Sequence, residues 1–175
     1  MPSPPDFLAL LAGNTDVVEM VNAGDSGLPV LDRLLSATQP AIGAAGVVFA
    51  EFGPTGGRVI AATSGVAWAI GRPVPTDDPT IRRMLAGPRV QQLRLEELPT
   101  GLVDVLTGRG LGHVIVARAE LRGMVIGCLY ALYPDADGAP GPEHRTALQF
   151  LAACAAHLYG DHAGLPVHGD GQVVA

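Results

Sequence analysis

The chain has 175 residues, and 48% of them are hydrophobic, so it is long and apolar enough to fold around one sizeable core. The formal net charge is −6, which argues against a nucleic-acid or an anionic-lipid partner because both need clustered positive charge. The longest apolar stretch, residues 111–133, is interrupted by Arg118, Glu120 and Arg122, so no membrane span is expected. We therefore expect a cytoplasmic protein.

The first quarter of the chain is predicted to be helical in two parts. Residues 1–27 form an N-terminal extension, which we expect to be partly helical over residues 5–22. A second helix is predicted over residues 28–39, with Asp25 or Ser26 as its cap and Pro29 in its first turn. Its apolar side chains recur at helical spacing: Leu28, Leu31, Leu35 and Ile42.

A hairpin and an irregular segment follow. Residues 46–52 and 58–64 are predicted strands, and the Gly/Pro-rich residues between them favour an antiparallel turn. Residues 66–110 are less regular, and segments of this kind often carry binding sites. Within them we expect short strands at 67–70 and 90–95 and short helices at 80–86 and 100–107.

The last third of the chain again shows regular patterns. Residues 114–118 and 124–133 are predicted strands, and the second is apolar on both faces, which is typical of a central strand covered on both sides. A long helix is expected over residues 143–159, and residues 160–175 are expected to be a disordered tail. The predicted fold class is therefore α+β, with a central antiparallel sheet flanked by helices.

Several segments in the same order resemble GAF domains. The run Gly71–Pro75 with Asp78 and Leu85–Gly87 is similar to the middle of that family, and Val114–Val116 with Val125–Ala131 is similar to its last hairpin. The resemblance covers residues 28–159 and implies a PAS/profilin-like architecture. The absence of lysine and the high alanine and glycine content favour a GC-rich bacterium, such as an actinobacterium.

The resemblance implies a sensory or regulatory module that binds a small ligand or a signalling partner protein. Residues 66–111 would cover a pocket on one face of the sheet, and helices 28–39 and 143–159 would lie together on the other. The segment Tyr133–Asp137 differs from the pattern of the cyclic-nucleotide-binding group. The sequence therefore names no specific ligand or cofactor.

Four residues are candidates for ligand binding. Trp68, the single tryptophan, offers a face for a planar ligand but could equally fill the core. Arg82 on the predicted helix could pair with a carboxylate or phosphate, or be simply exposed. His113 begins a core strand beside the expected pocket, where it could contact a ligand or only hydrogen-bond the backbone. Tyr130 in the long strand is the fourth candidate.

Two other functions remain as alternatives to ligand sensing. One is a scaffold without a ligand, which forms a homodimer through its terminal helices. The other is a redox enzyme that uses Cys128 and Cys154, but both cysteines stand in apolar runs that favour inert, reduced thiols. No catalytic triad, paired-carboxylate motif or metal-ligand spacing is recognisable, so we expect a binding protein and not an enzyme.

Overall fold

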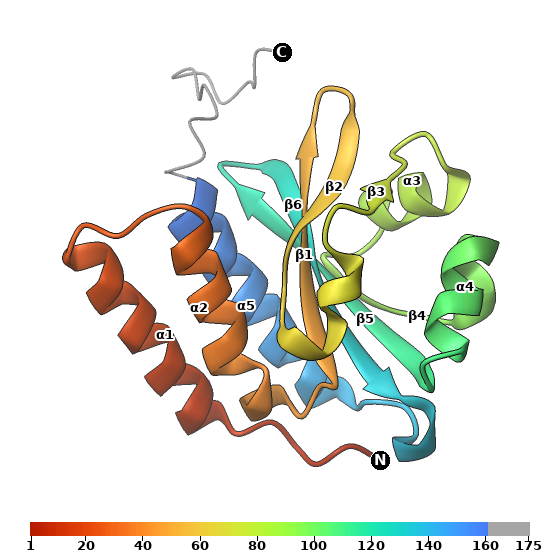
Figure 1. The fold of residues 1–175 in the computed structure, drawn as a ribbon, viewed down its shortest axis with the longest axis horizontal. Helices are drawn as coiled ribbons and strands as arrows, with labels where there is room; N and C mark the ends of the chain where they lie inside the picture. The colour runs from red at the N-terminus through yellow and green to blue at the C-terminus, as the bar shows by residue number, and fades with distance from the viewer. Residues whose placement is uncertain (161–175) are drawn as a thin grey trace.

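The computed structural model describes residues 1–160 and contains one six-stranded sheet (Figure 1). The strand order is β3-β2-β1-β6-β5-β4, and all neighbours are antiparallel. This confirms the predicted α+β class. The strands are β1 (Gly46–Gly53), β2 (Gly56–Ala62), β3 (Pro73–Val74), β4 (Val90–Leu93), β5 (Leu111–Leu121) and β6 (Met124–Pro134).

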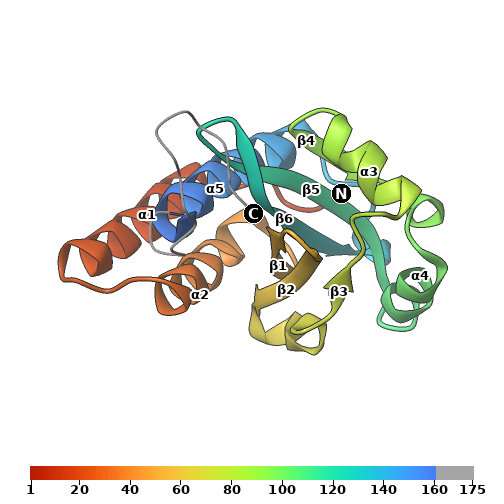
Figure 2. The same cartoon turned by 90° about the horizontal axis from the view of Figure 1, so that it is seen from above.

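Helices cover both faces of this sheet and form two different layers, as Figures 1 and 2 show. Three long helices pack on one face: α1 (Phe7–Asn22), α2 (Leu28–Thr38) and α5 (Pro142–Gly160). Two short helices lie over the other: α3 (Pro79–Ala86) and α4 (Thr100–Thr107). Four short 3-10 helices complete the fold: η1 (Pro40–Ile42), η2 (Ser64–Ala69), η3 (Leu95–Glu97) and η4 (Asp135–Asp137).

The long hairpin of β5 and β6 divides the core into two halves. Its turn is the pair Arg122-Gly123, both with positive φ (52° and 82°), as a two-residue hairpin of matching twist requires. Because side chains alternate along a strand, Leu129 and Ala131 of β6 face the long helices, whereas Cys128 and Tyr130 face the short ones. The sheet is thus the shared wall of two apolar layers.

The long-helix layer packs closely on the sheet. Small side chains of α5 allow this approach, because Ala147, Ala152, Ala155 and Ala156 are all fully buried. The helix α1 belongs to the same core, since it buries Leu10 and Val17. The helix α1, predicted as part of an N-terminal extension, thus packs against α2 and α5.

Buried polar contacts fix the first residues against α5. His144 is 2% exposed, and its Nδ1 accepts a hydrogen bond from the Gly141 N–H at 3.1 Å. Its Nε2 therefore carries the proton and donates to the Ser3 carbonyl at 3.0 Å. At the start of α1, Asp6 Oδ1 accepts from the Ala9 N–H at 3.0 Å as an N-cap.

The structure departs from the predicted elements in the irregular segment. Residues 67–70 do not form a strand, because residues 64–69 make the two turns of η2, joined at a kink where Val66 has φ −129°. The two-residue strand β3 was not predicted. The predicted tail lies outside the described residues except for Gly160, which ends α5. Within residues 1–160, every helix is too short or too polar to cross a bilayer.

Candidate functional site

The short-helix face of the sheet holds an apolar cavity of about 270 Å³. The strands β1, β2, β4, β5 and β6 form its floor, and η2, β3, α3 and α4 form its walls. Nearly all of its side chains are apolar, and no acidic residue is among them. The lining residues are Val48, Val59, Trp68, Ala69, Arg72, Pro73, Val74, Pro75, Thr80, Ile81, Met84, Leu93, Leu98, Pro99, Gly101, Leu102, Leu106, Val114, Tyr130 and Leu132.

The helix α3 is held over the cavity by polar contacts at both ends. Asp78 caps its first turn, with Oδ1 accepting from the Thr80 N–H at 2.8 Å. At the other end, Gln91 of β4 donates to the Met84 carbonyl at 2.7 Å, and Arg118 of β5 donates to the Leu85 carbonyl. These bonds tie α3 to the sheet edge and leave its apolar side facing the cavity.

Backbone hydrogen bonds hold the segment between β2 and α3 against the strand β2. The Val59 N–H donates to the Arg72 carbonyl and the Gly71 N–H donates to the Val59 carbonyl, both at 2.9 Å. Gly71 has φ 84°, a conformation that side-chain-bearing residues rarely adopt. The Thr63 hydroxyl, 3.0 Å from the Val47 N–H, anchors the start of η2. Trp68 and Arg72 are thereby placed at the cavity wall.

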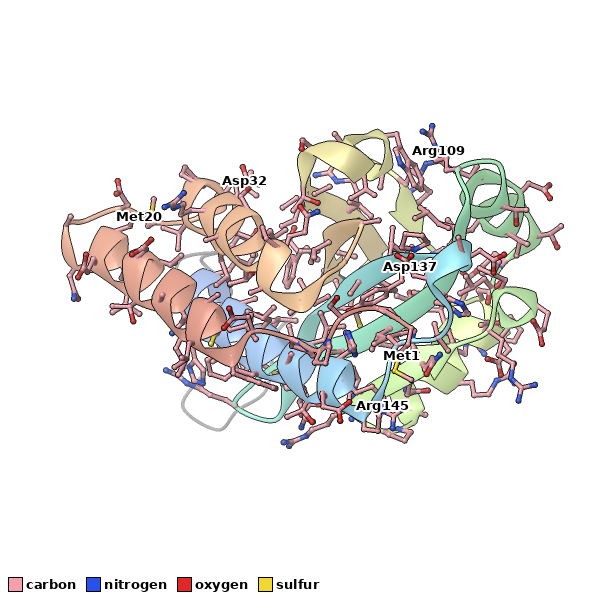
Figure 3. All side chains as sticks on the ribbon, turned by 90° about the horizontal axis from the view of Figure 1, so that it is seen from below. Met1, Met20, Asp32, Arg109, Asp137 and Arg145 are labelled. Carbon is pink, nitrogen blue, oxygen red and sulfur yellow. The ribbon has the colours of Figure 1, made fainter. Side chains whose placement is uncertain are left out.

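Two arginines lie against the single tryptophan. The guanidinium carbon of Arg72 is 5.2 Å from the centroid of the Trp68 ring, and that of Arg109 is 4.6 Å from it. Both distances are within the range of cation–π contacts. Arg109 comes from the loop between α4 and β5, and Figure 3 shows it beside η2, far from Met20 and Asp32 of the long-helix layer.

Two polar groups of the cavity wall have weak or no partners. The Nε1 atom of Trp68 is buried and makes no hydrogen bond with residues 1–160. The hydroxyl of Tyr130 is 4.0 Å from the sulfur of Met84, and burial raises the pKa of Tyr130 well above its usual value. Tyr130 is therefore neutral at physiological pH.

The four predicted ligand-binding residues separate into two pairs. Trp68 and Tyr130 line the cavity, whereas Arg82 and His113 are absent from its lining. Arg82 is exposed because α3 turns Ile81 and Met84 inward instead. His113 lies one position before Val114, which faces the cavity, so alternation directs the histidine toward the opposite face of β5. Arg82 and His113 therefore lie outside the lining of this cavity.

Arg72 and Arg109 were missed by the sequence analysis. The run Gly71–Pro75 carried only the family resemblance, and no pattern marked the position of Arg109. No sequence signal joins these two positions to Trp68, because the three residues meet only when the loop after α4 packs on η2.

Both cysteines are free and poorly suited to redox chemistry. Burial raises the pKa of the Cys128 thiol to about 12 and that of Cys154 to about 11. Cys128 is fully buried beneath the cavity floor, next to Tyr130, and neither cysteine lines the cavity. Because thiolates are the reactive form, both cysteines stay in the less reactive thiol form at neutral pH.

No cluster of three or more His, Cys, Asp or Glu side chains that could hold a metal ion occurs within residues 1–160.

Comparison with solved structures identifies the architecture. The phycoerythrobilin-bound GAF domain from a cyanobacterial phytochrome superimposes with a TM-score of 0.69 at 16% identity, covering 89% of this chain and 98% of that one. The chain has the fold of a GAF domain. This agrees with the family resemblance over residues 28–159.

Other similar structures support the same conclusion. A phycocyanobilin-bound GAF domain from a cyanobacterial phytochrome gives a TM-score of 0.67 at 17% identity, covering 87% of this chain and 97% of that one. The GAF domain/HD domain protein from Geobacter sulfurreducens gives 0.63 at 20% identity, with the same coverage. No protein-family model and no curated protein matches the sequence. The actinobacterial origin expected from composition is not supported by these comparisons.

Proposed function

We propose that the protein is a ligand-sensing regulatory module. The observation that carries this proposal is the apolar cavity on the short-helix face of a GAF-fold sheet. Its predominantly apolar lining is typical of small-molecule sites, and its volume of about 270 Å³ lies near the lower end of the roughly 300–1,000 Å³ that such sites span. Two similar GAF domains are bound to the chromophores phycoerythrobilin and phycocyanobilin, which supports the use of this fold for holding a small molecule.

The sheet connects the cavity to the long helices. Tyr130 faces the cavity, and its neighbours Leu129 and Ala131 contact the core beneath α5 and α2. A ligand that shifts β6 therefore changes the surface on which the terminal helices pack. A ligand can move this equilibrium only by binding one arrangement more tightly than another.

The first experiment is native mass spectrometry of freshly purified protein, followed by thermal-shift measurement with a small-molecule panel. We expect a retained mass that dissociates on denaturation, or a panel member that raises the melting temperature. With that ligand at saturation, hydrogen exchange should change in α1 and α5 as well as around the cavity. Binding without any change in the two helices would reject the signalling step, and a bare protein that no compound stabilises would reject sensing.

We place its action in the cytoplasm, and the two unpaired cysteines support this. Binding without turnover fits the raised pKa values of both thiols. In this proposal, the readout is contact with a signalling partner or with a second copy of the chain.

A specific surface favours the second copy. The stripe Phe7, Leu11, Asn14 and Val18 follows the outer side of α1, and its three apolar members are exposed. Beside it, α5 exposes Phe150, and a shallow apolar groove joins the two helices. Two such helix pairs would bury the stripes against each other in a four-helix arrangement, which is the alternative function as a dimerisation scaffold.

Light scattering after gel filtration tests this surface. Wild-type protein should elute as a dimer, and Phe150→Glu should convert it to a monomer because a buried unpaired carboxylate is costly. Ile70→Glu is the matched control, since Ile70 is also exposed and apolar but lies on the cavity side of the molecule. A wild-type monomer at every concentration would rule out self-association.

A further inference from the structure

The cation–π cluster, defined as Trp68, Arg72 and Arg109, places two positive charges at one edge of the cavity, because Trp68 and Arg72 line the cavity and Arg109 lies against the same indole ring. Both guanidinium carbons lie within 5.2 Å of one ring centroid. The two charges are therefore closer together than about 10 Å, roughly the Debye length at ~0.1 M salt. Each charge thus feels the repulsion of the other.

Neither charge of the cluster is neutralised by the described protein. All four ion pairs within residues 1–160 involve other arginines: Arg33, Arg89, Arg94 and Arg118. The lining of the cavity contains no carboxylate. This is notable in a chain of net charge −6, where carboxylates outnumber arginines.

The arginines, and not the indole N–H, are the donors that the cluster presents to a ligand. The Nε1 atom of Trp68 has no partner within the described residues, but it is buried and is therefore not exposed to the cavity. Both guanidinium groups are exposed. Two guanidinium groups suit a carboxylate, whose two oxygens accept about four hydrogen bonds.

We propose that the cluster binds the carboxylate of a small amphipathic acid whose apolar body fills the cavity. This inference rests on the proposed sensing function and names its ligand class. The cavity volume of about 270 Å³ fits a molecule on the order of ten non-hydrogen atoms, taking roughly 30 Å³ for each, the volume share of a water molecule. Its carboxylate remains at the exposed arginines, and its hydrocarbon part contacts Val114, Leu106 and Met84.

The test uses octanoate and octanol as a matched pair of probes on the full chain. Trp68 is the single tryptophan, so its fluorescence reports on the cluster directly, and isothermal titration calorimetry gives the affinity. Octanoate should bind at least tenfold more tightly than octanol at low salt. The ratio of the two affinities should fall at high salt, because the two arginines are exposed and salt screens exposed charges.

Three arginine variants separate the cluster from general charge effects. Arg72→Gln and Arg109→Gln should each weaken octanoate binding about tenfold and leave octanol binding unchanged. Arg33→Gln is the control, because Arg33 is exposed on α2 in the opposite layer and should alter neither.

The outcomes distinguish the two proposals. Equal binding of octanoate and octanol, or unchanged octanoate affinity in both cluster variants, would overturn the carboxylate inference while leaving a functional apolar cavity. Binding of neither probe would overturn the inference, and the panel described above would then decide separately on the sensing function.

Discussion

The cavity predicts opposite effects of the same substitution on the two faces of the sheet. Ala69 is 5% exposed and lines the cavity, whereas Ala61 is fully buried in the core beneath the long helices. Replacing either by leucine adds three carbon atoms. At Ala69 these atoms have free volume to enter, and at Ala61 they must displace packed neighbours.

The magnitudes follow from the structure. Three carbons need about 90 Å³ at roughly 30 Å³ each, which is a fraction of the 270 Å³ cavity. At about 0.8 kcal/mol per buried CH₂, Ala69→Leu should stabilise the fold by up to about 2 kcal/mol. This corresponds to a rise in Tm of about 4–8 °C for a chain of this size. Ala61→Leu should instead cost about 1–3 kcal/mol through overpacking.

Urea unfolding followed by far-UV circular dichroism measures both values, and titration with octanoate reports on the cavity. Ala69→Leu should also weaken octanoate binding, because it occupies part of the same space. Equal destabilisation by the two substitutions would refute the reasoning, since it would mean that the cavity is filled or collapsed in solution.

Three further predictions concern groups outside the cavity wall. The fully buried Cys128, its pKa raised to about 12, should react with iodoacetamide at pH 8 only as fast as the chain unfolds; native labelling at a free-thiol rate would contradict this. Arg118→Gln removes the hydrogen bond to the Leu85 carbonyl of α3 and the 2.9 Å ion pair with Glu120. It should lower the free energy of unfolding by about 1–3 kcal/mol, whereas the exposed control Arg33→Gln should lower it by at most about 1 kcal/mol. Burial and the neighbouring Glu51 raise the pKa of Tyr159 to about 12, above the value near 10 in the unfolded chain. The free energy of unfolding should therefore fall as the pH rises from 10 to 12, and it should fall less steeply in Tyr159→Phe. Identical dependence of the urea midpoint on pH in the two proteins would refute this.

The regular half of the fold was predictable from local pattern. The two hairpins and α5 carry strong periodicity and clear turn residues, so their positions were found to within a few residues. The strand expected at 67–70 was wrong because four apolar residues do not distinguish a strand from a 3-10 turn. The strand β3 escaped prediction because it is two residues long and begins with Pro73, and only its pairing with β2 defines it.

The candidate site was only partly predictable for a different reason. Trp68 and Tyr130 were chosen for their chemistry and do line the cavity. His113 lies outside the lining because it alternates with Val114 along β5, and the apolar sequence of this strand does not show which of its two faces looks onto the cavity. Arg109 reaches Trp68 from 41 positions away in the printed sequence, and such contacts depend on the tertiary fold.

The alternation along β6 has a consequence for how this protein could change over time. Cys128, Tyr130 and Leu132 face the cavity side, while Leu129 and Ala131 support the long helices. Replacements at the first set can alter the shape of the cavity without touching the packing of the second. One strand therefore lets chemical selectivity drift among descendants of the sequence while the surface offered to partners is inherited unchanged.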